Sequence, residues 1–253
     1  RADYKPVMIN PYSLAGKTIL VTGASSGLGA SIAVECSRLG AKLCITGRNE
    51  ARLNETFVKL EGEGHEQIVA DLIKKEDVIS LAQSLPVLDG LALCAGITKT
   101  LPVKFINDDA IDDIFKTNTL SSMSLIQKLL KQKKIAKQGS VVFLSSISTA
   151  YADKGNSIYA ASKGALNSFS RVLALEGAAS GIRSNCIQPG FVPSRMLDAG
   201  VVTTEQLQEE MKKYPLGFGE PTDIAYGVIY LLSDAARWVT GSVLTIDGGV
   251  TLR

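Results

Sequence analysis

The stretch Thr22–Gly29, "TGASSGLG", joins an apolar segment to an amphipathic one, and it decides the fold. Its glycines suit a sharp strand-to-helix turn. Gly23 permits the tight bend, while Gly27 and Gly29 let a ligand and the sheet approach the backbone closely. Exposed N–H groups and the helix dipole at such a helix start favour an anion such as phosphate. The spacing G-x-x-x-G-x-G differs from the G-x-G-x-x-G fingerprint, so an ordinary glycine-rich turn is the alternative interpretation.

Outside this turn, short apolar runs alternate with longer amphipathic segments. Strands are predicted over residues 17–23, 42–47, 66–71, 88–96, 139–146, 182–190 and 242–249. Helices are predicted over about 27–39, 49–61, 74–84, 108–133, 157–179 and 222–232. Because several strands are apolar enough to be covered on both faces, this alternation predicts an α/β fold with a doubly wound parallel sheet. Residues 191–219 show no clear period, and we expect a long surface segment there that acts as a substrate lid.

Composition excludes several classes of protein. The chain has 253 residues, 45% of them hydrophobic, which suits one domain over residues 14–253. A net charge of +2 gives little attraction to nucleic acid or to an anionic membrane, and no apolar run is long enough to span a bilayer. Residues 1–13 are expected to be an N-terminal extension, partly supplied by an expression vector, without the apolar core of a secretion signal. Four cysteines without a C-x-x-C pair, and a single histidine, favour a cytoplasmic protein and argue against a metal site.

The end of the second predicted strand, "CITGRNE", bears on cofactor choice. A dinucleotide fold that uses NAD places an acidic residue here, against the ribose 2′-hydroxyl. This chain has Gly47 followed by Arg48, whose cation would attract a 2′-phosphate, and Ser25 could add a hydrogen bond. NADP(H) is therefore predicted over NAD(H), and Asp71 could accept from an adenine amino group. A solvated arginine and a plain loop-starting or helix-capping aspartate are the alternatives.

The stretch "YAASK" places Tyr159 and Lys163 four residues apart on a predicted helix, hence on one face. A solvated helix face would explain the pair equally well if it stood alone. A phenol with a pKa near 10 exchanges protons poorly near neutrality, but a nearby cation lowers that pKa, whereas burial raises it. Ser146 ends the predicted strand 139–146, at the edge where ligands bind in open α/β sheets, and could donate to a substrate oxygen.

Seven motifs occur in order: "TGASSGLG", "CAG" at 94–96, "TN" at 117–118, "SS" at 145–146, "YAASK", "PGFV" at 189–192 and "SVLTIDGG" at 242–249. With these motifs the chain resembles the short-chain dehydrogenase/reductases, in particular the 3-oxoacyl-carrier-protein reductase-like subgroup. The resemblance implies a Rossmann-like fold with a seven-stranded sheet. It also implies NAD(P)-linked interconversion of a carbonyl and a secondary alcohol by a homotetramer or homodimer.

The resemblance also assigns roles to residues. Tyr159 becomes the acid/base, Lys163 its partner and Ser146 the group that orients the carbonyl. Asn118 becomes the residue that holds a proton-relay water. The cofactor site is predicted to comprise Gly23, Ser25, Ser26, Gly27, Leu28, Gly29, Arg48, Asn49, Asp71, Leu72, Ala95, Gly96, Asn118, Tyr159, Lys163, Pro189, Gly190, Val192 and Ser194.

One residue departs from the family pattern, since Cys94 stands where the family has an asparagine that braces the central strands. Two interpretations of this thiol are an inert small hydrophobe and a sensor of oxidants beside the cofactor. The alternative function is a non-catalytic NADP(H)-binding regulator on the same fold. The presence of Asn118, Ser146, Tyr159 and Lys163 together disfavours it.

The substrate is left open by the sequence, with a 3-oxoacyl thioester as one candidate. A reductase dedicated to an acyl carrier needs a basic landing patch for its acidic partner. The candidates are Lys99, Lys104, Lys131, Lys133 and Lys134, the last three of which also suit a solvated charge run.

Overall fold

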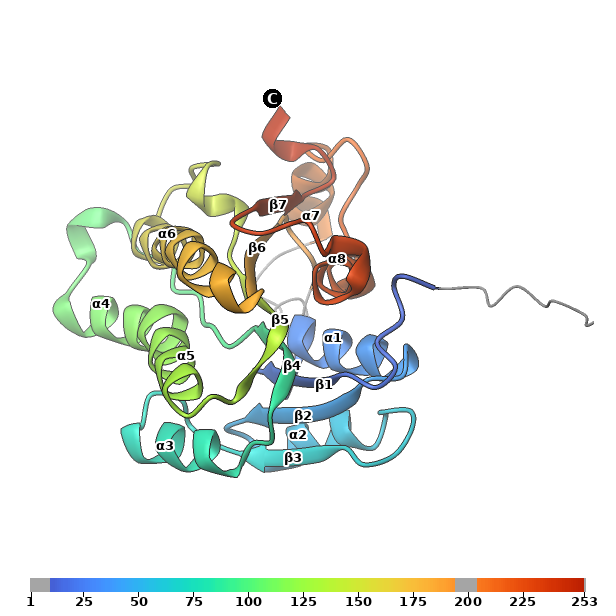
Figure 1. Ribbon diagram of the computed structural model, residues 1–253. Helices are drawn as coiled ribbons and strands as arrows, with labels where there is room; N and C mark the ends of the chain where they lie inside the picture. Colours follow the sequence, from blue (N-terminus) through green and yellow to red (C-terminus); the bar gives the residue numbers. More distant parts are fainter. Residues whose placement is uncertain (1–9, 194–203, 253) are drawn as a thin grey trace, which may run out of the picture.

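A seven-stranded parallel sheet forms the centre of the molecule, whose computed structural model describes residues 10–193 and 204–252 (Figure 1). The strands are β1 (Thr18–Thr22), β2 (Lys42–Gly47), β3 (Glu66–Val69), β4 (Leu88–Leu93), β5 (Ile135–Leu144), β6 (Arg183–Pro189) and β7 (Val243–Ile246). Their order is β3-β2-β1-β4-β5-β6-β7, and every neighbouring pair is parallel. The strand order therefore reverses direction between β1 and β4, which confirms the predicted doubly wound, single-domain α/β fold.

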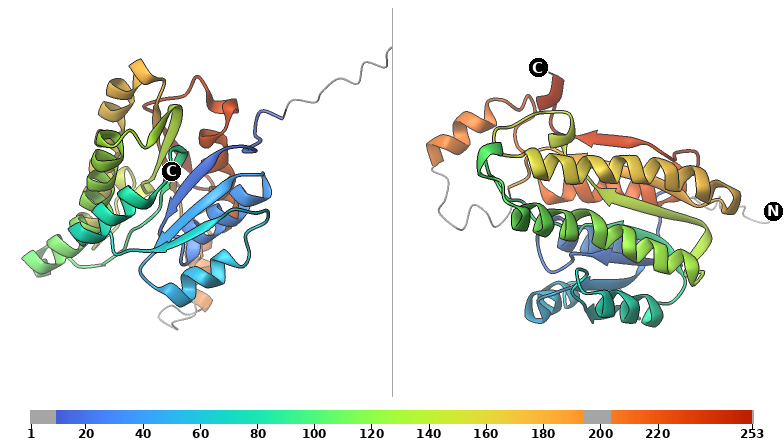
Figure 2. Two further views of the ribbon diagram at one scale, coloured as in Figure 1. Left: turned by 60° about the horizontal axis from the view of Figure 1, so that its bottom comes forward. Right: turned by 90° about the vertical axis from the view of Figure 1, so that its left-hand side faces the viewer.

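Helices cover both faces of this sheet. They are α1 (Gly27–Arg38), α2 (Glu50–Phe57), α3 (Lys75–Ser84), α4 (Asp108–Phe115), α5 (Ser121–Lys131), α6 (Ser157–Gly177), α7 (Thr204–Met211) and α8 (Pro221–Leu232). Figure 1 shows α1 and α8 on the right of the sheet and α4, α5 and α6 on the left, and Figure 2 shows the same layers from two other sides.

Side chains alternate between the two layers along each strand. Ile19 and Val21 of β1 pack with the α1 and α8 layer, whereas Leu20 between them packs with the α3, α5 and α6 layer. In β5, Val142 faces the first layer and Phe143 the second, where the Phe143 ring meets Phe169 edge-on at 5.9 Å. Burial on both faces explains why these strands read as unbroken apolar runs.

Two parts of the prediction were wrong in detail. The segment 108–133 is not one α-helix, because a π-helical turn at Lys116–Leu120 separates α4 from α5. There the N–H of Ser121 bonds to the carbonyl of Lys116, five residues back. Residues 204–211 form α7 inside the stretch predicted to be a surface segment, a helix whose sequence "TEQLQEEM" is too polar to show an apolar face.

β5 begins four residues earlier than predicted. Its register against β4 shifts between Leu88 and Gly90, and Gln138 adopts a left-handed φ of 64° at this irregularity. The lysine-rich approach to the strand hides its start in the sequence. Among the helices of residues 10–193 and 204–252, none combines the length and apolar character needed to cross a bilayer.

Replacing Phe143 by alanine should lower the free energy of unfolding by about 3–5 kcal/mol, because it empties a fully buried site and removes the edge-on contact with Phe169. Urea unfolding measures this. Phe105→Ala is the matched control, since that ring is 62% exposed and its loss should cost little. Equal destabilisation by the two substitutions would contradict the described core.

Candidate active site

A cavity of about 780 Å³ opens at the carboxyl ends of the strands. Most residues predicted to form the site line it, from the β1–α1 turn to the start of α6. The predicted residues on its walls are Gly23, Ser25, Ser26, Gly27, Leu28, Gly29, Arg48, Asn49, Asp71, Leu72, Ala95, Gly96, Ser146, Tyr159, Lys163, Pro189, Gly190 and Val192. Ser194 lies outside the described residues, as do residues 194–203 of the predicted lid.

The glycines of the β1–α1 turn are required by close backbone contacts. A Cβ on Gly29 would lie 2.4 Å from the carbonyl oxygen of Gly23, and one on Gly23 would lie 2.8 Å from the backbone of Ala95. Gly23 also has a left-handed φ of 65°. The turn is therefore pressed against the end of β4, which leaves the backbone as the floor of the cavity.

The first turn of α1 presents its N–H groups without a side-chain cap. Ser26 is the N-cap residue and makes no capping hydrogen bond, whereas Asn49 caps α2 by accepting from the N–H of Arg52. Uncapped N–H groups at a helix start carry partial positive charge and bind anions. Beside them, the hydroxyl of Thr46 is buried on the cavity wall and has no hydrogen-bond partner among the residues that the structure describes. These donors fit the phosphate and ribose groups of a dinucleotide.

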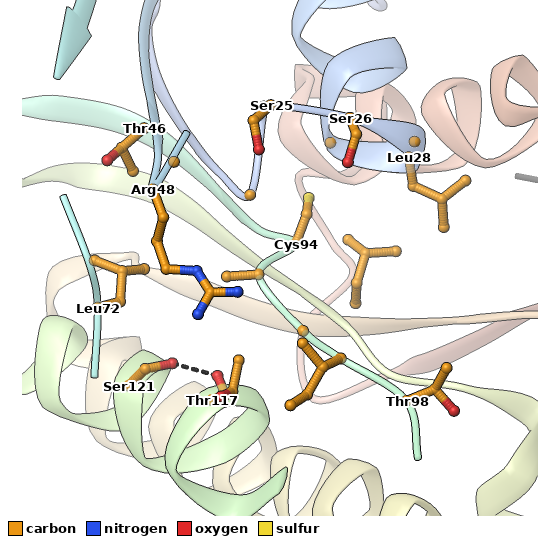
Figure 3. A pocket seen from close by; sticks show the side chains of 18 of the residues that line it. Ser25, Ser26, Leu28, Thr46, Arg48, Leu72, Cys94, Thr98, Thr117 and Ser121 are labelled. Carbon is orange, nitrogen blue, oxygen red and sulfur yellow. Dashed lines mark hydrogen bonds between the residues drawn. The ribbon is translucent and has the colours of Figure 1, made fainter. Parts of the chain in front are cut away.

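Arg48 lies at the β2 end of the cavity. Its side chain extends into the space bounded by Leu72 and Cys94, as Figure 3 shows, and it forms no salt bridge with any residue in the described ranges. The absence of a side chain at Gly47 lets Ser25 lie close to the end of β2, next to Arg48. A Cβ on Gly47 would lie 3.1 Å from the Ser25 hydroxyl oxygen. A hydroxyl and a guanidinium thus share one end of the cavity.

Asp71 lines the same end but has a structural task as well. Its carboxylate accepts from the N–H of Ile73 at 3.3 Å, which closes the turn after β3. The loop-starting alternative weighed from the sequence therefore describes part of its role, whereas the helix-capping alternative does not, because Lys74 is the N-cap residue of α3. The second carboxylate oxygen has no hydrogen bond to the residues in the described ranges.

Tyr159 and Lys163 meet at the opposite end of the cavity, on the first turns of α6. The Lys163 ammonium lies 5.8 Å from the centre of the Tyr159 ring and donates to the carbonyl of Leu144 at 2.7 Å. Burial lowers the pKa of Lys163 to about 8, a trend that the thiols of Cys94 and Cys186 partly oppose. The ammonium is thus buried against the end of β5 and beside the phenol.

Burial is the largest influence on the pKa of Tyr159. It raises the pKa of the phenol above 10, while a hydrogen bond with the Ser146 side chain works in the opposite direction. The lowered pKa expected from the sequence is therefore absent from the protein alone. The hydroxyl oxygen of Ser146 accepts a hydrogen bond from the N–H of Ser148 at 3.1 Å, which helps to fix this side chain. Further charge is needed in the cavity to favour the phenolate.

Asn118 does not line the cavity. Its side chain is fully buried in the π-helical turn, where Oδ1 accepts from the N–H of Ile97 at 2.7 Å. Its amide nitrogen donates to the Ile97 carbonyl at 2.9 Å and to the Ser162 hydroxyl at 3.1 Å. The residue thus fixes the segment after β4 to α6, and all its side-chain groups are satisfied.

Cys94 lines the cavity next to Ala95. Burial raises the pKa of its thiol to about 12, although Lys163 opposes this rise. The thiolate is the reactive form of cysteine, and a raised pKa disfavours that form near neutral pH. That environment favours the interpretation as a small hydrophobe over the sensor.

Several lining residues were not included in the predicted site, although the sequence analysis had already placed Cys94 beside the cofactor. They are Thr46, Gly47, Arg52, Ala70, Ile73, Cys94, Ile97, Thr98, Thr117, Ser121, Leu144 and Ser145. Most of them are direct neighbours of predicted positions, so wider motif windows would have included them. Thr117 and Ser121 lie at the π-helical turn, where the Ser121 hydroxyl donates to the Thr117 carbonyl at 2.6 Å (Figure 3). No group of three metal-ligating side chains occurs among the residues described.

Comparison with known proteins identifies the fold's relatives. The family model described as enoyl-(acyl carrier protein) reductase matches residues 23–251. The 3-oxoacyl-(acyl-carrier-protein) reductase FabG of Rickettsia prowazekii is 35% identical over 244 residues, which cover 94% of this chain and 98% of that protein. A tropinone reductase homolog of Arabidopsis thaliana is 32% identical over 251 residues, which cover 95% of this chain and 94% of that protein.

The chain belongs to the short-chain dehydrogenase/reductase family. Solved structures agree with this membership. A short-chain type dehydrogenase/reductase from Mycobacterium ulcerans has a TM-score of 0.86 at 28% identity, over 95% of this chain and 92% of that one. A candidate 2-deoxy-D-gluconate 3-dehydrogenase of Agrobacterium tumefaciens, solved with bound NADP, has a TM-score of 0.87 at 28% identity, over 97% and 100%. Members of this family bind a nicotinamide cofactor and oxidise or reduce CH–OH and C=O groups of small molecules.

In this short-chain dehydrogenase/reductase, Lys163→Met should change how stability depends on pH. The folded-state pKa of Lys163 is about 8 against 10.5 for a free lysine, so between these values the unfolded state binds more protons and wild-type stability rises with pH. Relative to the variant, the wild type should therefore gain about 2 kcal/mol between pH 7 and pH 9.5. Urea unfolding at the two pH values measures this. The exposed Lys131→Met is the control, and parallel pH curves for wild type and Lys163→Met would refute the buried charge.

Proposed function

We propose that the protein is an NADPH-dependent oxidoreductase that interconverts a carbonyl and a secondary alcohol, with Tyr159 as the general acid/base. The observation that carries the proposal is the convergence of Tyr159, Ser146 and Lys163 at one end of a cavity that holds Arg48 at its other end. Proton-transfer groups and a phosphate-sized cationic site are thereby combined in a single space. The family's carbonyl and alcohol chemistry agrees with this arrangement.

The chain's own residues account for the proton side of the reaction. When bound, the nicotinamide supplies or accepts the hydride. In the reductive direction, the Tyr159 hydroxyl gives its proton to the substrate oxygen, and the bond from the phenolic oxygen to that proton breaks. Ser146 donates a hydrogen bond to the same oxygen as negative charge develops there. Lys163 stabilises the phenolate that remains, and the reverse sequence serves alcohol oxidation.

The proposed cofactor preference rests on the β2 end of the cavity. Arg48 extends there without a salt bridge to the described residues, and the wall carries no carboxylate at the end of β2 that would repel a 2′-phosphate. Gly23, Gly29 and the uncapped start of α1 would hold the diphosphate. Asp71 would face the adenine.

A 3-oxoacyl thioester is the substrate class to test first, since the name of the Rickettsia prowazekii relative specifies it. Of the lysines that could receive an acidic carrier, Lys99 lies 3.8 Å from the carboxylate of Asp113 and Lys104 lies over the ring of Phe105.

We include in the proposal a cytoplasmic location, which four free cysteines favour, and a homotetramer. Exposed apolar residues on the outer faces of α5 and α6, such as Leu130 and Val172, favour association of subunits.

NADPH should bind at least tenfold more tightly than NADH, and Arg48→Ala should reduce this ratio towards one, because the guanidinium would pair with the 2′-phosphate. Fluorescence titration with both cofactors measures the two dissociation constants. Arg171→Ala, on the exposed face of α6, is the control and should leave the ratio unchanged. Equal affinities in the unaltered protein would reject the proposed preference for NADPH.

Tyr159→Phe should reduce turnover by about 10²–10⁴-fold while NADPH binding persists, since the substitution removes the proton donor and keeps the ring. NADPH oxidation is followed against ketones, quinones, sugars and 3-oxoacyl thioesters, and the best substrate is used for the variant. Tyr226→Phe, on the exposed side of α8, is the matched control. Retained turnover by Tyr159→Phe would rule out the acid/base role, and NADPH binding without turnover of any substrate by the wild type would favour the regulator.

A further inference from the structure

A buried amide lies behind the Ser146 loop and is tied to it through one side chain. Gln188, near the end of β6, is 8% exposed and donates from its amide nitrogen to the hydroxyl of Thr149. The Thr149 hydroxyl in turn donates to the backbone carbonyl of Ser146 at 3.1 Å. On its other side, the amide oxygen of Gln188 accepts from the hydroxyl of Thr245 on β7 at 3.2 Å. One directed chain of hydrogen bonds therefore runs from β7 through β6 to Ser146.

This chain ends on the turn that sets the direction of the Ser146 hydroxyl. Ser146 is the N-cap of a 3-10 turn, Ile147–Thr149, and its side-chain oxygen accepts from the N–H of Ser148. The same oxygen donates its proton to the Ser148 hydroxyl at 3.1 Å. The backbone N–H of Ser148 occupies one lone pair of the Ser146 hydroxyl oxygen. The directions left for the Ser146 O–H bond therefore depend on the position of the turn Ile147–Thr149. Thr149 closes that turn, so whatever holds Thr149 also holds the hydroxyl of Ser146.

Gln188 itself does not reach the cavity, since its neighbours Pro189 and Gly190 line the wall while its side chain is directed to Thr149. The Thr149 hydroxyl also receives the amide of Asn167 at 3.4 Å, a longer contact from α6. The Thr149 hydroxyl is therefore held by an amide from β6 as well as by one from α6. The loop that carries Ser146 is therefore attached to β5, which it follows, and also to β6 through the hydrogen bond between Gln188 and Thr149.

We propose that Gln188 is a positioning residue that, by fixing Thr149, holds Ser146 where its hydroxyl can turn from the Ser148 hydroxyl, to which it donates in this structure, to the substrate oxygen. The inference rests on the proposed function, in which Ser146 donates to that oxygen. The amide is needed because it offers a donor to Thr149 and an acceptor to Thr245 at the same time. A carboxylate would accept from both hydroxyls and would draw the proton of Thr149 away from the Ser146 carbonyl.

The test compares Gln188→Glu, Gln188→Met and Thr149→Val with the wild type, using the best substrate from the panel. Each variant should lower kcat at least tenfold, because misplacing a hydrogen-bond donor by a fraction of an ångström reduces the rate steeply. The dissociation constant for NADPH should stay within twofold of the wild type. Gln188→Glu should be at least as impaired as Gln188→Met, since it redirects the threonine proton rather than merely losing the donor.

Two double variants separate positioning from general stabilisation. Gln188→Met with Thr149→Val should be no slower than either single variant, because both break the same chain. In the Ser146→Ala background, Gln188→Met should cause no further loss of kcat. Ser140→Ala removes another buried hydroxyl from β5, which bonds to the carbonyl of Leu231 at 2.7 Å, and should lower stability without lowering kcat.

The outcomes keep the two proposals apart. Absence of turnover by the wild type would overturn the proposed function, whereas unchanged kcat in Ser146→Ala would overturn the catalytic role of the serine and, with it, the positioning role of Gln188. A large loss in Ser146→Ala with wild-type kcat in Gln188→Met and Gln188→Glu would overturn the positioning role alone. A further loss from Gln188→Met in the Ser146→Ala background would also overturn it, because the glutamine would then act by another route.

Discussion

The site depends on one steric constraint, the contact between the β1–α1 turn and the end of β4. Gly29 touches the carbonyl of Gly23, and Gly23 touches the backbone of Ala95, at distances that no Cβ atom could occupy. The contact lies between β1 and β4, where the strand order reverses. The chain connections that follow these two strands run to opposite sides, and this leaves a crevice at the carboxyl ends of the strands. Because the turn is held by backbone, its N–H groups face the crevice without side chains in between. The cavity is therefore a consequence of the topology together with the absence of two Cβ atoms.

At the opposite end of the cavity, β5 organises the proton-transfer groups. Its last residue, Leu144, supplies the carbonyl that holds the Lys163 ammonium, and Ser146 follows two residues later. Burying the Lys163 ammonium costs free energy, which its pKa of about 8 reflects, and the hydrogen bond to the Leu144 carbonyl offsets part of this cost. The geometry thus holds a cation beside Tyr159 at the expense of stability, as is common where chemistry is performed.

The sequence predicted the fold closely because both faces of the sheet are buried, so that each strand appears as an apolar run and each crossover helix as an amphipathic one. The resemblance to the family predicted most of the residues along the cavity walls, and they lie together because parallel strands end at the same edge of the sheet. The sequence could not show the π-helical turn at Lys116–Leu120, since nothing in "KTNTL" departs from an ordinary helix pattern. Nor could it show that Asn118 uses its whole amide to hold Ile97, because that contact joins segments 21 residues apart.

The balance of charges around Tyr159 depended on the three-dimensional structure as well. A cation four residues away suggested a lowered phenol pKa, but burial raises the pKa of Tyr159, and the influence that opposes burial is the hydrogen bond with Ser146. Proton transfer near neutral pH then requires a second positive charge in the cavity, such as an oxidised nicotinamide brings with it. The phenol would thus be protonated while the cavity lacks that charge and would become a better base once it arrives. A buried phenol beside a single buried ammonium therefore links the protonation of Tyr159 to what the cavity holds, and a lysine closer to the phenol would weaken that link.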